Sequence, residues 1–68
     1  MIEIIVNKKS YSYDNTTKLK QVLEDLNLYT QPGIAVAVNN EVIPKEGWET
    51  HLLKDKDQVL IITATQGG

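Results

Sequence analysis

The alternation of apolar and polar residues predicts strands near both ends of the chain and in its middle. Residues 2–7 are rich in β-branched side chains whose two faces alternate, as in a strand. A polar turn at 8–10 and alternating residues at 11–13 predict a second strand that pairs with the first as a hairpin. Residues 34–38 predict a third strand and residues 59–65 a last, most apolar one.

One segment has the period of an amphipathic α-helix rather than that of a strand, and it predicts a helix over residues 18–26. Residues 14–17, just before it, are of types that favour turns and helix N-caps. Asn27 suits a left-handed C-terminal cap. The apolar stripe consists of Leu19, Val22, Leu23 and Leu26.

The second half of the chain is punctuated by short connections. Residues 29–33 form a loop, and the Asn39-Asn40 pair favours a hairpin turn because Asn tolerates positive φ. A short strand at 41–43 would pair back and end at Pro44. Residues 45–53 are expected to be irregular or to form one short helical turn, followed by a charged turn at 54–57.

A single helix covers only one face of such a sheet, so the other face should be open. The strand residues expected on the covered face are Ile2, Ile4, Val6, Ile34, Val36, Val38, Val59 and Ile61. The residues expected on the open face are Ile5, Ala35, Ala37, Leu60, Ile62 and Ala64, where polar side chains are usual. We interpret this apolar set in two ways. Ile5, Leu60, Ile62 and Ala64 form a partner-docking surface, or half-exposed side chains simply stabilise the strands.

Composition narrows the class of protein. The 68 residues suffice for one domain, and the absence of cysteine suits a reducing compartment, so we expect a cytoplasmic protein. A net charge of −2, a pI of about 5.2 and the lack of arginine argue against a nucleic-acid partner. We expect no signal peptide and no membrane association, since no apolar run approaches the roughly 20 residues of a membrane span.

The chain also lacks the residue patterns of common active sites. His51 is the only histidine, and it is interpreted as a surface or helix-end residue. The dispersed carboxylates show no calcium-loop spacing, and there is no phosphate-binding glycine motif. We therefore expect neither a catalytic site nor a metal site nor an intrinsic cofactor.

The sequence ends with Gln66-Gly67-Gly68, directly after the last strand. Such an end often merely frays. Alternatively, the side-chain-free Gly67 and the slender approach through Gln66 would let the α-carboxylate of Gly68 reach deep into the active site of another enzyme. On this interpretation the domain is a handle, and the chemistry takes place at Gly68.

Two segments resemble the sulfur carriers of thiamine biosynthesis, the ThiS family. The first is residues 36–45 together with Trp48, and the second is residues 53–62 followed by Gln66-Gly67-Gly68. The resemblance covers the whole chain. It implies an α+β fold of the ubiquitin-like β-grasp class, with a mixed sheet, one helix on one face and a C-terminal Gly-Gly tail. The expected organisation is a single domain at 1–65 and a flexible tail at 66–68.

The resemblance further implies a carrier that partner enzymes act on. An adenylating enzyme of the ThiF type would use ATP and magnesium to convert the Gly68 carboxylate into an acyl-adenylate. Sulfur from a persulfide, supplied through a cysteine desulfurase, would replace AMP and leave a thiocarboxylate. A thiazole synthase of the ThiG type would consume that sulfur in making the thiazole of thiamine.

Two positions depart from the family pattern. Lys56 stands where many relatives have glycine. If the turn requires a positive φ at this position, lysine costs roughly 1 kcal/mol or more; otherwise the turn is of another type. Lys45 stands where arginine is common and loses bidentate geometry. Trp48 is interpreted as covering one edge of the core rather than contacting a partner. The three tyrosines are interpreted as core-edge or surface residues: Tyr11, Tyr13 and Tyr29.

Three alternatives share parts of this pattern. The small subunit of molybdopterin synthase also has the fold and the terminal glycines, but Pro44 and Trp48 favour the thiamine family. A ubiquitin-like modifier would use the same acyl-adenylate and then form a thioester. A regulatory binding module would have an idle tail.

Overall fold

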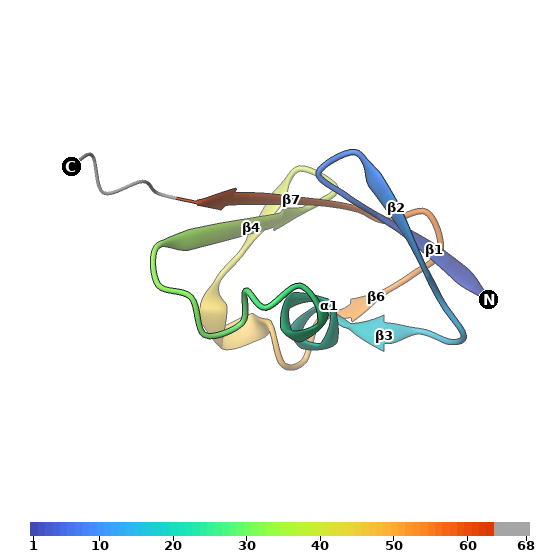
Figure 1. Cartoon of the computed structure of the whole chain (residues 1–68), viewed down its shortest axis with the longest axis horizontal. Coiled ribbons are helices and arrows are strands. Elements are labelled where there is room, and N and C mark those ends of the chain that lie inside the picture. Colours follow the sequence, from blue (N-terminus) through green and yellow to red (C-terminus); the bar gives the residue numbers. More distant parts are fainter. Residues whose placement is uncertain (64–68) are drawn as a thin grey trace.

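The computed structural model describes residues 1–63, so that residues 64–68, including Ala64 and the Gln66-Gly67-Gly68 end, lie outside the described residues. One sheet of five strands carries the fold, with a single helix packed on one face (Figure 1). Its strands are β1 (Ile2–Val6), β2 (Lys9–Tyr13), β4 (Ile34–Val38), β5 (Glu41–Ile43) and β7 (Gln58–Thr63). Their spatial order is β2-β1-β7-β4-β5, which places the last strand in the centre.

The pairing makes the sheet mixed, as expected. Strand β7 runs parallel to β1 and antiparallel to β4, while β1–β2 and β4–β5 are antiparallel hairpins. Both hairpins turn through two residues with positive φ, Asn39-Asn40 in one and Asn7-Lys8 in the other. The turn expected at 8–10 thus begins one residue earlier, because Val6 pairs directly with Lys9.

The helix α1 (Leu19–Asp25) begins without a side-chain cap, so the expected capping role of residues 14–17 is wrong. Two main-chain carbonyl groups satisfy its first amides instead. His51 accepts a hydrogen bond from the Leu19 N–H at 2.9 Å, and Trp48 accepts one from the Lys20 N–H at 2.9 Å. The C-terminal end follows the prediction, since Asn27 has a left-handed φ of 61°.

A second, two-stranded sheet was not predicted. Strand β3 (Thr17–Lys18) pairs antiparallel with β6 (Leu52–Leu53), next to the helix (Figure 1). Two residues are too few for alternation to identify a strand. The short helical turn expected within 45–53 is present as a 3-10 helix over Lys45–Gly47.

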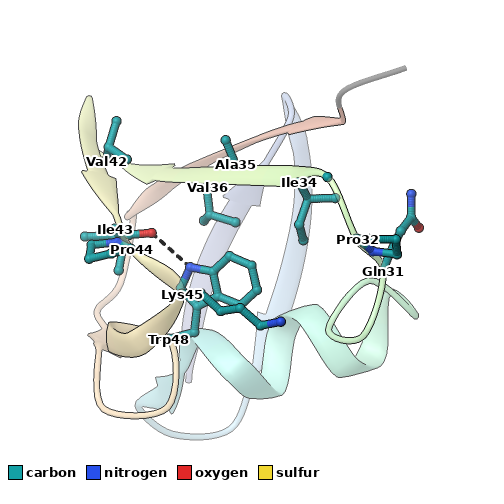
Figure 2. Close-up of a pocket in the computed structure, with 11 residues that line it drawn as sticks. Gln31, Pro32, Ile34, Ala35, Val36, Val42, Ile43, Pro44, Lys45 and Trp48 are labelled. Carbon is teal, nitrogen blue, oxygen red and sulfur yellow. Dashed lines mark hydrogen bonds between the residues drawn. The ribbon is translucent and has the colours of Figure 1, made fainter. Parts of the chain in front are cut away.

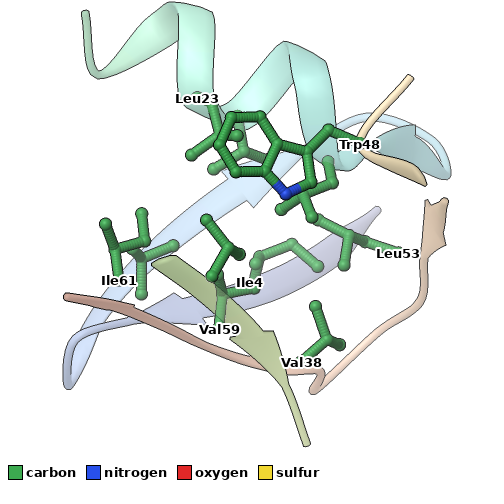
Figure 3. Packing of buried hydrophobic residues seen from close by; sticks show 11 residues of the cluster. Ile4, Leu23, Val38, Trp48, Leu53, Val59 and Ile61 are labelled. Carbon is green, nitrogen blue, oxygen red and sulfur yellow. The ribbon is translucent and has the colours of Figure 1, made fainter. Parts of the chain in front are cut away.

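The core lies between α1 and the covered face of the five-stranded sheet, where Trp48 packs between the helix and the strands (Figure 3). Ile2, Ile34 and Leu26 are only partly buried because they lie at the ends of their elements. Trp48 and Leu53 join the core from outside the regular pattern. The buried residues are Ile4, Val6, Leu19, Val22, Leu23, Val36, Val38, Trp48, Leu53, Val59 and Ile61. Within residues 1–63, no helix has the length and apolar character to cross a membrane.

Candidate functional site: the open face and the end of β7

Strand β7 presents two large apolar side chains on the face away from the helix. Leu60 is 51% exposed and Ile62 is 56% exposed, while their neighbours Val59 and Ile61 are buried on the other side. Leu60 lies opposite Ala37, and Ile62 lies opposite Ala35, on β4. Because both alanines are small, the two large side chains stand above the adjoining surface of the sheet.

Val42 extends this apolar face to the edge strand, and the sequence interpretation did not include it. Its side chain is 71% exposed. In the strand register Val42 lies opposite Ala37 on β4, and Ala37 lies opposite Leu60 on β7. Figure 2 shows Val42 and Ala35 pointing away from Trp48, on the opposite side of the sheet. The turn at Asn39-Asn40 was a usable signal, because a two-residue hairpin fixes which residues pair.

The predicted residue Ile5 lies farther along the same face and is half-buried. With Leu60 it lines a hollow of about 320 Å³ between the two hairpin turns. Lys8, Asn40 and Gln58 also line this hollow, so its lining combines apolar and polar groups. An apolar patch with polar residues at its margin is the common anatomy of a protein-docking surface. We define the open face as Ile5, Ala35, Ala37, Val42, Leu60 and Ile62.

A charged turn next to β1 holds Lys56 at a φ of 72°, so of the two alternatives the chain adopts the left-handed conformation. The Lys56 N–H donates to the Glu3 carbonyl oxygen at 2.7 Å, and its ammonium group lies 2.6 Å from the Glu3 carboxylate. The hydrogen bond from Lys56 lowers the pKa of Glu3, and the same contact raises the pKa of Lys56. The Glu3 N–H donates to the Asp55 carboxylate at 2.7 Å.

A notch of about 240 Å³ lies where β5 leaves the sheet (Figure 2). Ile34 lines this notch and pairs with Thr63, the last described residue of β7. The Trp48 indole forms part of the wall and donates a 2.9 Å hydrogen bond from Nε1 to the Ile43 carbonyl oxygen. Lys45 is exposed beside the notch. The last described residue of β7, Thr63, is therefore paired with a residue that lines the notch.

The other candidate residues within the described chain contribute to the fold. Trp48 is 3% exposed, as its core interpretation required, and the three tyrosines pack against the margin of the core. His51 lies at the helix start, where its carbonyl group accepts the Leu19 N–H. No group of three or more potential metal ligands occurs within residues 1–63. Ala64, Gln66, Gly67 and Gly68 lie outside the described residues, so the structure places none of them.

Comparison with known proteins identifies the family. The model of the ThiS family matches residues 4–68. The chain belongs to the ThiS family. The sulfur carrier protein ThiS of Escherichia coli (strain K12) is 30% identical over 67 residues, covering 98% of this chain and all of the relative.

Solved structures of ThiS agree with the fold. The crystal structure of the thiamine biosynthesis protein ThiS from Geobacter metallireducens matches with a TM-score of 0.80 at 25% identity, covering 98% of this chain and all of that one. An NMR structure of a thiamine biosynthesis protein from the same organism matches with a TM-score of 0.76 at 25% identity, covering 98% and 88%. The β-grasp architecture is thereby confirmed, and so is the expectation of a sulfur carrier of thiamine biosynthesis that other proteins act on.

Proposed function

We propose that this ThiS chain carries sulfur as a thiocarboxylate on the α-carboxyl group of Gly68. The supporting observation is that the family match extends through residue 68 and therefore includes Gln66, Gly67 and Gly68. The domain at 1–65 docks on the partner enzymes, and the tail at 66–68 extends into their active sites. We place this activity in the cytoplasm, where a cysteine-free carrier needs no oxidising compartment.

The chemistry must be supplied mainly by partners. The α-carboxyl group of an unstructured peptide has a pKa of about 3.5, so it is ionised at neutral pH and is a poor acceptor for nucleophiles. Attack of this carboxylate on the α-phosphorus of ATP releases pyrophosphate and creates an acyl-adenylate with a good leaving group. A sulfur nucleophile then forms the C–S bond as AMP leaves. The adenylating enzyme, of the ThiF type, supplies magnesium and the groups that neutralise the phosphates.

The open face is the proposed docking surface for that enzyme. Leu60, Ile62 and Val42 stand out from the sheet, and burial of such apolar area gives most of the driving force for association. The same face serves the thiazole synthase, of the ThiG type, when the thiocarboxylate is consumed. A persulfide that originates from a cysteine desulfurase attacks the acyl-adenylate through its terminal sulfur as AMP leaves, and a thiol then reduces the S–S bond of the resulting acyl disulfide and releases the thiocarboxylate. This transfer takes place on the adenylating enzyme, so no direct contact with the desulfurase is required.

The intact mass of the protein tests this proposal. The full chain is incubated with ATP, magnesium, a ThiF-type adenylating enzyme and ammonium sulfide. The expected product is the chain with one oxygen replaced by sulfur. The control variant lacks Gly68. It should show no mass change and should melt at the same temperature as the full chain, because the buried core residues of the described chain run only as far as Ile61.

The alternative functions give different results. Sulfur uptake by the variant without Gly68 would contradict the assignment of the carboxylate. Isopeptide adducts on lysines of other proteins would show a ubiquitin-like modifier instead. Sulfur transfer from the charged chain to the precursor of molybdopterin, with none to a thiazole synthase, would place the chain in the other biosynthetic pathway.

A further inference from the structure

Asn7 makes contacts that its position in a hairpin turn does not require. It is the first turn residue between β1 and β2, with a φ of 49°. Its side-chain Oδ1 accepts a hydrogen bond from the Ile61 N–H at 2.8 Å, and its Nδ2 donates one to the Ile61 carbonyl oxygen at 3.1 Å. One side-chain amide thus satisfies both main-chain groups of a residue 54 positions away.

This carboxamide takes the place of a strand residue. Strand β1 pairs with β7 only through Ile5 and Val6, and the Asn7 N–H then donates to the Val59 carbonyl oxygen at 3.0 Å. In a parallel ladder, every second residue of a strand turns its N–H and its C=O toward the same neighbour. The next such residue after Val59 is Ile61, and the main chain of β1 has already turned away there. The amide group of Asn7, which has the chemistry of a peptide group, continues the ladder by one step.

The residues on either side of Ile61 are the proposed docking residues Leu60 and Ile62. These two pair with Ala37 and Ala35 of β4 on the other edge of β7. From Leu60 to Ile62, β7 is therefore held along both edges, by β4 on one side and by the Asn7 side chain on the other. One residue after Ile62 the described part of the chain ends, at Thr63.

We propose that Asn7 is a positioning residue that holds the end of β7, and with it the docking side chains and the origin of the tail, in the geometry that the adenylating enzyme binds. The inference rests on the proposed function. Loss of the carboxamide would let β7 separate from its β1-side neighbour beyond Val59. The partner would then have to order this segment when it binds, so the loss would appear mainly in KM.

A simpler explanation is that Asn7 serves only the turn, because asparagine tolerates a left-handed backbone. Substitution Asn7→Gly separates the two roles. Glycine adopts positive φ at no steric cost and so preserves the turn, but it has no amide to offer Ile61. Asn7→Asp keeps an acceptor for the Ile61 N–H and loses the donor to the Ile61 carbonyl oxygen. The matched control is Asn27→Gly, at a left-handed residue with a φ of 61° after the helix, outside the open face.

Amide hydrogen exchange, measured residue by residue by NMR, tests the contact itself. In Asn7→Gly, exchange at Ile61 should accelerate roughly tenfold or more relative to exchange at Leu23 in the helix, because the bond to Oδ1 is lost. Asn7→Asp should give a smaller increase, and Asn27→Gly should leave the ratio unchanged. Equal acceleration at Ile61 and Leu23 in Asn7→Gly would mean that Asn7 contributes only to global stability, and it would overturn the proposal.

Steady-state adenylation, followed as pyrophosphate release with a ThiF-type enzyme, tests the consequence. Asn7→Gly should raise KM for the carrier several-fold with kcat within about twofold of the wild type, and Asn27→Gly should change neither. An unchanged KM in Asn7→Gly would overturn the positioning role. If wild-type chain releases no pyrophosphate, the proposed function fails, and the exchange ratio alone decides whether Asn7 holds β7.

Discussion

The Nε1 of Trp48 donates a 2.9 Å hydrogen bond to the carbonyl oxygen of Ile43, the last residue of β5. The indole is 3% exposed, and its ring centroid lies 6.4 Å from that of Tyr29 at a tilt of 57°. This one side chain therefore fills the core and also fixes the point where the edge strand leaves the sheet. The 3-10 helix that precedes Trp48 contributes no buried residue, so the indole covers the core on the side of the notch.

Trp48→Phe should lower the free energy of unfolding by about 1–3 kcal/mol, since the hydrogen bond from Nε1 to the Ile43 carbonyl oxygen is lost and the smaller ring leaves space. Trp48→Ala should cost about 3–5 kcal/mol and leave little folded protein. Urea unfolding followed by far-UV circular dichroism measures both. As a control, Tyr29→Phe removes only an exposed hydrogen bond to Glu49 and should change stability little. Equal losses for Trp48→Phe and Tyr29→Phe would show that the Ile43 contact contributes nothing.

Lys56→Gly should raise the melting temperature by a few degrees. A residue with a Cβ at a φ of 72° is strained, and glycine removes that strain. The substitution also removes the ion pair with Glu3, which is solvent-accessible and weak. Because salt screens that pair in the wild type, the gain from glycine should be larger at high ionic strength. A melting temperature that falls at every salt concentration would show that the contacts of the Lys56 side chain outweigh the strain.

The stability of the folded protein at acidic pH should depend on Glu3. Its pKa is lowered in the folded protein, chiefly by the hydrogen bond from Lys56, so the unfolded chain binds the proton more readily. The contribution to stability is therefore present above the unfolded pKa, about 4.5, and is lost as the pH falls through the folded pKa. The difference in melting temperature between wild type and Glu3→Gln should shrink from about pH 6 to about pH 3. A difference that stays constant over this range would contradict the coupling.

The sequence was most informative where a regular pattern of hydrophobic residues extends over several residues. Five of the strands, the helix and its Asn27 cap follow from alternation, from the 3.6-residue stripe and from residues that tolerate positive φ. The β3–β6 pair and the burial of Leu53 were missed, because two-residue strands carry no period and their pairing depends on tertiary packing. The bonds that cap the start of α1 come from main-chain groups about thirty residues away, so no local pattern could reveal them.

The residues of the candidate site likewise fall into those that the sequence pattern revealed and those that only the structure revealed. Ile5, Leu60 and Ile62 were found from alternation alone, whereas Val42 required the register of the β4–β5 hairpin. The amide of Asn7 contacts Ile61 across 54 positions, and only the three-dimensional arrangement shows it. The residue proposed to carry the sulfur, Gly68, and the preceding Gly67 were suggested by the terminal motif and by the family resemblance.

Charge placed on the open face should weaken association with the adenylating enzyme without an equal loss of stability. Leu60→Lys, Ile62→Lys and Val42→Lys each replace a side chain that is at least half exposed, so the folded monomer tolerates a solvated ammonium group there. In a complex the same group would be buried against the partner without its water, which is costly unless the partner supplies an acidic group. The dissociation constant, measured by isothermal calorimetry, should rise tenfold or more, equivalent to about 1.4 kcal/mol.

Leu52→Lys is the matched control for these substitutions. Leu52 is 53% exposed, close to the 51% of Leu60, but it lies on β6 in the small sheet beside the helix and outside the open face. The Leu52→Lys variant should bind the enzyme as the wild type does. Its melting temperature should fall by at least as much as that of Leu60→Lys. If Leu52→Lys weakens binding as much as Leu60→Lys, the effect is a general consequence of added charge. If none of the three open-face variants changes the dissociation constant, the apolar face only stabilises its strands, and the enzyme docks elsewhere on the domain.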